Sequence, residues 1–281
     1  MKKHFKKLLL MALMAVMAVG LIACGTDKSD NESTKEEKTS VTITSLDASK
    51  NEIELEVPYN PKRIAILDLA SLDIIDELGV GDRVVGMAST SIDYLEKYSN
   101  DASIKNLGTI KEADLEAVME CEPDIIFIGG RLSKSYDALS EIAPVVYLAT
   151  DTNEGLVNSV SKNAKTIASI FGMEDKVDSL MSDFGARIDA IKKISSGKTA
   201  LVGMTTSGSF NLLGNDGRCS LIGVEAGFNN LTAAGSTSTH GNESSFETVV
   251  QQNPDYIFVM DRDSAISTAG AKTAKEIVEN E

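Results

Sequence analysis

The chain has 281 residues, which suggests two compact units at about 150 residues per domain. Its apolar content of 42% is ordinary for a globular protein, whereas a formal charge of −15, the absence of Trp and only 5% aromatic residues argue against a nucleic-acid partner, which needs a basic or aromatic face. A protein this acidic can bind an anionic ligand only where positive side chains cluster locally.

The N-terminal residues have the pattern of a secretory signal peptide over 1–23. Met1–Lys7 contains four lysines, and Leu8–Ala23 is an unbroken run of 16 apolar and glycine residues. That run is shorter than the roughly 20 residues that a membrane span requires, but it fits the apolar core of a signal peptide. It ends in Leu21-Ile22-Ala23-Cys24, which resembles the bacterial lipobox, whose cysteine is lipidated after cleavage. An ordinary signal peptide that happens to contain a cysteine is the alternative interpretation.

Residues 24–40 are expected to comprise the lipidated Cys24 and a flexible tether, because the segment is rich in Ser, Thr, Asp, Glu and Lys and lacks apolar periodicity. The protein is therefore expected outside the cytoplasm, anchored to the cell membrane. Cleavage of the leader removes four of the 27 basic residues and none of the 42 acidic ones, which leaves a net charge of −19. Cys121 and Cys219 are predicted to be two small buried side chains, with a disulfide as the alternative.

Short strands and helices alternate in the first part of the folded chain. In chain order, we predict a β-hairpin over Val41–Val57, a strand over Ile64–Leu67, a helix over Ser71–Leu78, a strand over Val84–Met87, a helix over Asp114–Cys121 and a strand over Ile125–Ile128. Gly79 is a natural end for the first helix, and Pro123 breaks the second. Such alternation predicts a parallel sheet of the α/β type.

The pattern changes in the middle of the chain. Gly155–Ile194 has helical periodicity and no strand signal, with an interruption only around Gly172. The alternation of strands and helices then resumes. Its apolar segments are Ala200–Met204, Leu221–Ala226 and Ile257–Met260. We therefore expect an N-terminal α/β lobe over 41–154, a linking helix over 155–195 and a C-terminal α/β lobe over 196–281.

An internal repeat supports two related halves. Residues 114–131 have the sequence DLEAVMECEPDIIFIGGR and residues 245–262 have SFETVVQQNPDYIFVMDR, with seven identities and no gap. The match includes a Pro-Asp pair and aligns Arg131 with Arg262. Two unrelated helix–Pro-Asp–strand units could share part of this pattern by chance. Duplication of a lobe is the better interpretation.

Four stretches of the chain carry a resemblance to a known family. They are Asn60–Asp68, Gly129-Gly130-Arg131, Thr239-His240-Gly241 and Asn253–Arg262. As a set they resemble the ferric-siderophore-binding lipoproteins of ABC importers, in particular those that take catecholate ligands such as enterobactin and petrobactin. The resemblance covers nearly all of the chain after the leader, although no single stretch would be diagnostic.

The resemblance implies an α/β fold of two Rossmann-like lobes joined by a long helix, with the ligand cleft between the lobes. It implies a monomer that captures a ferric siderophore and delivers it to an ABC permease, with no permanently bound cofactor and no enzymatic activity. Proteins of this family continue beyond a point like Glu281 with a helix, a strand and a final helix, and a loop there supplies a tyrosine iron ligand. Because this sequence stops within a predicted helix, Ala274–Glu281, we expect its C-terminal lobe to be incomplete.

Three of the six arginines are candidate ligand-binding residues. Arg131 and Arg262 each follow a predicted strand, and the ligand crevice of an open α/β sheet lies at the carboxyl ends of its strands. Arg218 lies in the turn-rich loop Asn215-Asp216-Gly217-Arg218. The resemblance places all three around the anionic oxygens of a catecholate, which suits a guanidinium group that stays charged and donates paired hydrogen bonds. The alternative for each is a surface ion pair.

His240 is the one histidine that remains once His4 is lost with the leader, and it lies in the polar loop 235–242. The resemblance implies that His240 ligates ferric iron when the siderophore supplies fewer than six donors, and imidazole is a suitable ligand for iron. The alternative is an ordinary exposed histidine in a loop.

Glu116 and Glu247 occupy equivalent positions near the starts of two predicted helices. Acidic residues there complement the helix dipole, and Ser244–Glu247 has the sequence of a capping box. The resemblance implies a second role, in which one such glutamate on each lobe pairs with arginines of the permease.

Other functions of the same architecture remain alternatives. A zinc or manganese carrier needs several converging His and carboxylate ligands, and the mature chain has one histidine. A haem or cobalamin carrier stays open, because His240 could ligate either metal. A metal-cluster or chelatase-like enzyme is the alternative from another class, although the sequence has no nucleophile elbow, phosphate loop, dinucleotide fingerprint or HExxH motif.

Overall fold

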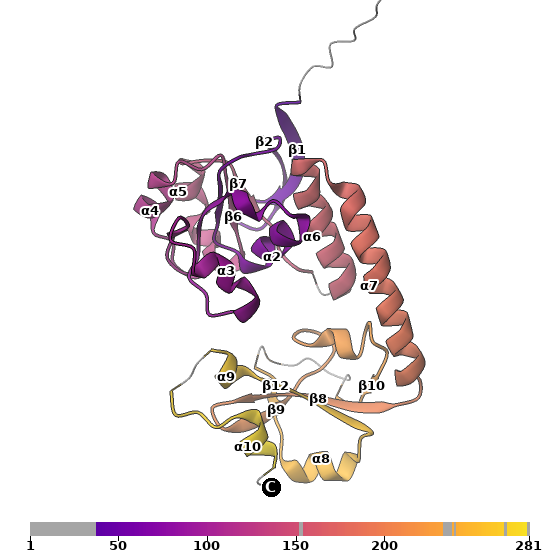
Figure 1. Cartoon of the computed structure of the whole chain (residues 1–281). Helices are drawn as coiled ribbons and strands as arrows, with labels where there is room; N and C mark the ends of the chain where they lie inside the picture. The colour runs from indigo at the N-terminus through magenta and orange to yellow at the C-terminus, as the bar shows by residue number, and fades with distance from the viewer. Residues whose placement is uncertain (1–37, 152–153, 233–237, 239, 267–268, 280–281) are drawn as a thin grey trace, which may run out of the picture. The chain divides into compact units, whose positions relative to one another are not determined.

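The computed structural model describes residues 38–151, 154–232, 238, 240–266 and 269–279 (Figure 1). The predicted signal peptide, Cys24 and the tether up to residue 37 lie outside the described residues. Among the residues that are described, no helix is both long enough and apolar enough to cross a membrane.

A β-hairpin opens the described part of the chain. β1 (Ser40–Leu46) pairs antiparallel with β2 (Glu52–Pro58). Asp47 holds the turn, because its Oδ1 accepts hydrogen bonds from the backbone amides of Ser49 and Asn51, each at 2.8 Å. The predicted hairpin is therefore confirmed.

A five-stranded parallel sheet follows, in the strand order β5-β4-β3-β6-β7. Its strands are β3 (Ile64–Ile66), β4 (Val84–Met87), β5 (Lys105–Asn106), β6 (Ile125–Ile128) and β7 (Val145–Tyr147). The helices between them are α2 (Leu69–Leu78), α3 (Glu96–Ser99), α4 (Leu115–Glu120) and α5 (Tyr136–Ser140), with the 3-10 helices η1 (Gly81–Arg83), η2 (Asp93–Leu95) and η3 (Gly130–Ser135). The predicted strands and helices of this part are confirmed, and β5 and β7 add to them.

Side chains of this sheet alternate between two apolar clusters, one on each face. Ile64 and Ile66 pack with the hairpin, α2 and α6 (Leu156–Phe171), whereas Ala65 and Leu67 pack with α4 and α5. Figure 1 shows the same arrangement, with α4 and α5 on one side of β6 and β7 and with α2 and α6 on the other. Because both faces are covered, the strands are continuous apolar runs rather than alternating ones.

The helical stretch predicted over 155–195 consists of two helices rather than one. α6 ends at Gly172, whose φ of +67° lies in the left-handed region that favours glycine. The last turn of α6 is buried in the core of the first sheet, with Ile170 at 0% exposure. Only the second helix, α7 (Glu174–Ser195), leads on to the next sheet, so it alone has the place of a linking helix. The lobe boundaries at residues 154 and 196 stay predictions.

The second sheet is mixed, so it departs from the all-parallel sheet of a Rossmann-like lobe, which the resemblance implies for both halves. β8 (Thr199–Thr206) pairs parallel with β10 (Asn229–Asn230) and β12 (Tyr256–Asp261) and antiparallel with β9 (Ser209–Leu212), which in turn pairs with β11 (Asn242–Glu243). Ser207 and Gly208, with φ of +52° and +79°, form the two-residue turn between β8 and β9. The apolar segment Leu221–Ala226 adds no strand, because the chain there forms the 3-10 helix η5 (Ser220–Ile222) and a turn.

Three short helices complete this half: α8 (Phe246–Gln252), α9 (Arg262–Ala265) and α10 (Ala274–Val278). The capping box predicted at Ser244 is not formed, because the N-cap of α8 is Ser245, whose hydroxyl accepts a hydrogen bond from the Thr248 amide. A capping box is present instead at the start of α10, where Thr273 and Glu276 bond each other's backbone amides.

Candidate ligand-binding site

The internal repeat of the sequence is also a repeat of backbone structure. In each half a short helix (α4 or α8) leads to one left-handed residue, a Pro-Asp pair and a parallel strand (β6 or β12), with Cys121 as an additional residue between α4 and the left-handed residue. The left-handed residues, Glu122 and Asn253, occupy equivalent positions and both have a φ of +44°. This agreement in backbone geometry supports the duplication, and it gives Arg131 and Arg262 equivalent places after their strands.

The aspartate of each Pro-Asp pair ties the repeated strand to its neighbour. Asp124 Oδ2 accepts hydrogen bonds from the amides of Lys62 and Arg63, which lead into β3, at 2.7 and 2.9 Å. Asp255 Oδ2 accepts from the amide and the hydroxyl of Thr199, the first residue of β8, at 2.8 and 3.0 Å. Both halves therefore use the same device to set the position of the strand that carries the arginine.

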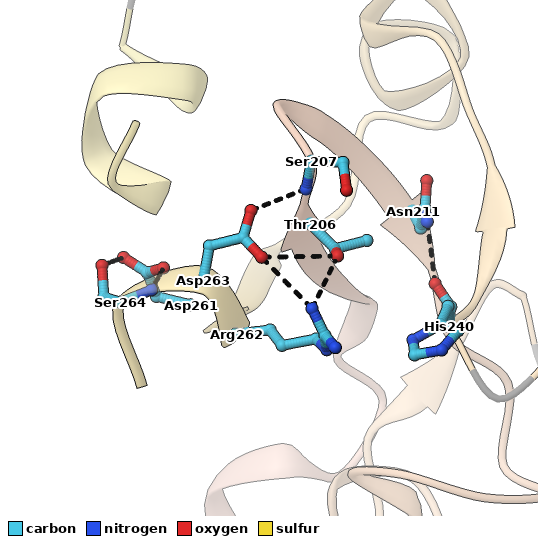
Figure 2. Close-up of polar contacts among 8 residues, drawn as sticks. All are labelled: Thr206, Ser207, Asn211, His240, Asp261, Arg262, Asp263 and Ser264. Atoms are coloured by element: carbon cyan, nitrogen blue, oxygen red, sulfur yellow. Dashed lines mark hydrogen bonds and ion pairs between the residues drawn. The ribbon is translucent and has the colours of Figure 1, made fainter. Parts of the chain in front are cut away.

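Arg262 begins α9 directly after β12 and is held by two polar side chains (Figure 2). Its Nη1 donates to Thr206 Oγ1 at 3.1 Å and to Asp263 Oδ1 at 3.3 Å. Asp263 is buried, and it also accepts a hydrogen bond from the Ser207 amide at 2.6 Å. Within the described residues, Nε and Nη2 of Arg262 have no partner, so these donors are available to a ligand.

Arg131 lies in η3 and is separated from the end of β6 by Gly129 and Gly130, and its side chain is exposed. Among the residues that the structure describes, its guanidinium makes no hydrogen bond or ion pair. The alternative interpretation of Arg131 as a surface ion pair therefore receives no support from the described contacts.

A cavity of about 220 Å³ lies at the carboxyl ends of the first sheet, next to Arg131 in the chain. Asp68 after β3, Gly129 and Gly130 after β6, and Asn163 on α6 contribute to its wall. A Cβ at Gly129 would lie 2.6 Å from Asp68 Oδ1, so the glycine leaves the space that this carboxylate occupies. Asp68 also caps α2, since its Oδ2 accepts from the Ser71 amide at 2.9 Å. The cavity has the location expected for a ligand site in an open α/β sheet.

Arg218 is exposed and precedes Cys219, which has a φ of +60°. Burial raises the pKa of the Cys219 thiol, and the nearby charge of Arg218 partly opposes that shift. The loop before Arg218 is fastened by Asn230, whose Nδ2 donates to Asn215 Oδ1 at 3.1 Å and to the Leu213 carbonyl at 3.0 Å. Cys121 and Cys219 are free thiols rather than a disulfide; Cys121 is buried as predicted, whereas Cys219 is only half-buried.

His240 has an exposed side chain in the segment that precedes β11. Its carbonyl oxygen accepts a hydrogen bond from Asn211 Nδ2 at 2.8 Å (Figure 2). The next residue, Gly241, has a φ of +77°, and a Cβ there would lie 2.8 Å from the Leu212 carbonyl. The backbone on the C-terminal side of His240 is therefore fixed against β9. Thr239, part of the motif on which the resemblance rests, lies outside the described residues.

A family model described as a periplasmic binding protein matches residues 64–281. The chain belongs to this family.

Three relatives place the chain more narrowly within the family of periplasmic binding proteins. The petrobactin-binding protein YclQ of Bacillus subtilis (strain 168) is 35% identical over 98% of this chain and 86% of its own length. Its crystal structure has a TM-score of 0.77 and covers 86% of this chain, which in turn covers 84% of that structure. The periplasmic catecholate-siderophore binding protein VctP of Vibrio cholerae has a TM-score of 0.76 at 27% identity, with coverage of 86% and 85%. The ferric-anguibactin-binding protein FatB of Vibrio anguillarum is 26% identical over 73% of this chain and 65% of its own length.

These comparisons confirm the family resemblance and the two-lobed α/β fold of periplasmic binding proteins. The family and the relatives named here are substrate-binding proteins, and the relatives include siderophore-binding proteins. The roles of individual residues of this chain are not decided by the comparisons and stay predictions.

Glu116 and Glu247 are the second residues of α4 and α8, and both are exposed. Asp114 and Ser245 cap the two helices through their side chains, so neither glutamate is needed as the cap. Both glutamates are therefore accessible to a partner from equivalent positions of the repeat.

The sequence interpretation missed three polar residues next to the candidate arginines: Asp68, Thr206 and Asp263. The role of Asp68 as a helix N-cap could have been predicted from the sequence, because an aspartate that follows a strand and precedes Ser71 by three residues is typical of an N-cap. No pattern in the sequence indicates that Asp263 is buried, since its burial depends on the hairpin of β8 and β9.

Proposed function

We propose that this protein binds a ferric siderophore of the catecholate type outside the cytoplasm and delivers it to an ABC importer, and that it acts as a binding protein rather than as an enzyme. The observation that carries the proposal is that Arg131 and Arg262 align in the repeat and that both lie beyond the carboxyl end of a parallel strand. Arg262 directly follows β12, and Arg131 follows β6 after Gly129 and Gly130. The names of the relatives, which include petrobactin- and catecholate-siderophore-binding proteins, support the same ligand class.

The chemistry of the arginines fits this ligand. A catecholate presents two adjacent anionic oxygens, and a guanidinium group donates two parallel hydrogen bonds while it stays charged. On a chain whose net charge is −15, an anion will be bound only where such groups are concentrated. We assign Arg131, Arg262 and Arg218 to the ligand oxygens, with Arg218 as the member whose loop is fastened through Asn230.

His240 is proposed as an additional iron ligand, used when the siderophore leaves coordination positions open. Imidazole nitrogen is a suitable donor to iron. The exposed side chain of His240 makes no hydrogen bond within the described residues, so no protein contact has to be broken for it to reach a ligand. Iron here is cargo that arrives with the siderophore, and the proposal includes no permanently bound cofactor.

Delivery of the ferric siderophore requires contact with the permease and attachment to the membrane. We propose that Glu116 and Glu247 pair with basic residues of the permease, one from each repeat, and that the monomeric protein is held at the membrane by a lipid on Cys24. Relatives of the chain are named as lipoproteins of ABC transporters, which supports this location.

The proposed function is tested by uptake of radioactive iron from a ferric catecholate, in a strain that lacks this protein but keeps its importer. The wild-type protein is expected to restore uptake, and neither haem nor cobalamin in excess is expected to compete. The Glu116→Ala/Glu247→Ala double variant is expected to reduce uptake at least about tenfold, because charged pairs at an interface are costly to truncate, while the purified variant binds ligand as the wild type does.

A further variant tests the proposed location. Cys24→Ser is expected to release the protein from the membrane fraction. Loss of ligand binding by the purified glutamate variant would remove the docking role, and competition by haem or cobalamin would replace the siderophore with that ligand.

A further inference from the structure

Asp263 is a buried carboxylate that the binding chemistry described so far does not use. Its side chain is 3% exposed, whereas that of the neighbouring Arg262 is 28% exposed. A carboxylate is rarely buried unless it is paired and hydrogen-bonded, because desolvation of its charge is unfavourable. The partners of Asp263 therefore indicate what the burial achieves.

The two oxygens of Asp263 have different partners (Figure 2). Oδ2 accepts from the backbone amide of Ser207 at 2.6 Å, in the turn between β8 and β9. Oδ1 faces Arg262 Nη1 at 3.3 Å and Thr206 Oγ1 at 3.5 Å. Thr206 Oγ1 also accepts from Arg262 Nη1 at 3.1 Å, which closes a triangle of three side chains. One end of this network is anchored in the backbone, and the other end is a guanidinium group.

The equivalent position of the other repeat has no such group. One repeat length earlier, Arg131 is followed by Leu132, which is 1% exposed and packs in the apolar cluster on the α4 and α5 face. Arg131 has no hydrogen-bond partner among the described residues. The repeat therefore contains two arginines at equivalent sequence positions, and within the described residues only Arg262 is held by its neighbours.

We propose that Asp263 is a positioning residue, which fixes the Arg262 guanidinium so that Nε and Nη2 point toward the siderophore before it binds. An arginine side chain has several rotatable bonds, and ordering it in advance reduces the cost of ordering it on binding. Nη1 is occupied by Thr206 and Asp263, which leaves a defined pair of donors for the ligand. This inference rests on the proposed function, since it assumes that Arg262 contacts the anionic ligand.

The test is a double-mutant cycle on affinity for a ferric bis-catecholate, with Asp263→Asn, Arg262→Ala and their combination. With Arg262 present, Asp263→Asn is expected to weaken binding by about tenfold, a coupling within the range found for side chains in one network. With Arg262→Ala, the same change is expected to alter affinity by less than about twofold, because no guanidinium is left to position.

Gly208→Ala is the matched control for a purely structural role. Gly208 lies in the turn that Asp263 supports, with a φ of +79° and no atom within 4 Å of an added Cβ, so the substitution strains the turn without reaching Arg262. It is expected to lower the stability to urea and to leave affinity unchanged. Thr206→Val, which removes the shared hydroxyl, serves as a second test of the network if Asp263→Asn does not fold, and its effect should likewise require Arg262.

The outcomes distinguish failure of the positioning role of Asp263 from failure of the proposed ligand-binding role of Arg262. An equal loss of affinity from Asp263→Asn with and without Arg262, no loss in either, or an equal loss from Gly208→Ala, would overturn the positioning role alone. A wild-type protein that does not bind the ferric catecholate, or an Arg262→Ala variant that binds as tightly as the wild type, would remove the proposed role of Arg262 and this inference with it.

Discussion

Arg131 and Arg262 align in the repeat but have different neighbours, since Arg262 is held by Asp263 and Thr206 whereas Arg131 is followed by the buried Leu132. Their alignment in a repeat and their position after a strand are visible in the sequence, and the structure places both residues accordingly. Their surroundings could not be predicted, because the next residue is a buried leucine in one half and a buried aspartate in the other. Burial of Asp263 depends on the β8–β9 hairpin, whose short second strand was also missed.

Asp261, which precedes Arg262, provides a pH-dependent prediction at the same scale. Hydrogen bonds from the Ala274 amide and from Ser264 lower the pKa of its carboxyl below the ordinary value of 3.8. A depressed pKa means that the stabilisation is complete above pH 3.8 and is lost as the pH falls through the lower folded-state value.

Asp261→Ala is expected to lower the free energy of unfolding by about 1 kcal/mol at neutral pH, the usual cost of losing such a cap. The difference from the wild type should shrink below pH 3.8, as measured by urea unfolding at a series of pH values. A difference that stays constant down to the acid limit would show that the charge of Asp261 contributes nothing.

At the scale of elements, apolar runs in the sequence predicted most strands and helices of the first half of the folded chain and fewer of those of the second half. Strands of the first sheet are buried on both faces, so they stand out as apolar runs between helices. In the second sheet, β10 and β11 have two residues each, too short for any periodicity to develop. The segment Leu221–Ala226 suggested regular structure but forms a 3-10 helix and a turn, in which Ile222 packs against the cluster of Val202 and Met204 on β8 while Val224 is exposed.

The break between α6 and α7 gives a prediction about these elements. Gly172 has a φ of +67°, and a Cβ there would overlap the Tyr59 hydroxyl. Gly172→Ala is therefore expected to lower the free energy of unfolding by about 1–3 kcal/mol, since it combines a left-handed non-glycine residue with a steric clash.

Gly185 provides the matched control for this prediction, because it lies inside α7 with no atom within 4 Å of an added Cβ. Gly185→Ala should raise stability by about 0.5–1 kcal/mol through helix propensity. Both values follow from chemical denaturation. If Gly172→Ala were as stable as the wild type, neither the left-handed conformation nor the contact with Tyr59 would be what requires glycine at this break.

At the scale of the whole molecule, the family and the two-lobed fold could be predicted because several distant stretches, Asn60–Asp68 and Asn253–Arg262 among them, agree on one architecture. The linking element was predicted less well: the helical region of 155–195 divides at Gly172, and only α7 leads from one half toward the other. Periodicity indicates that both segments are helical, but it does not show that α6 packs into the first core.

The proposed function assigns ferric-catecholate binding to two arginines that align in the repeat, Arg131 and Arg262. The most direct test is a titration of the purified protein with a ferric bis-catecholate, followed through the iron–catecholate absorption band retained after desalting. Arg131→Ala and Arg262→Ala are compared with Arg187→Ala, an exposed arginine of α7 outside the candidate site. The wild type and Arg187→Ala are expected to retain the colour, and each of the other two variants is expected to bind at least about tenfold more weakly, because a charged partner of the ligand is truncated. Wild-type protein without retained colour, or arginine variants that bind as tightly as the wild type, would contradict this assignment.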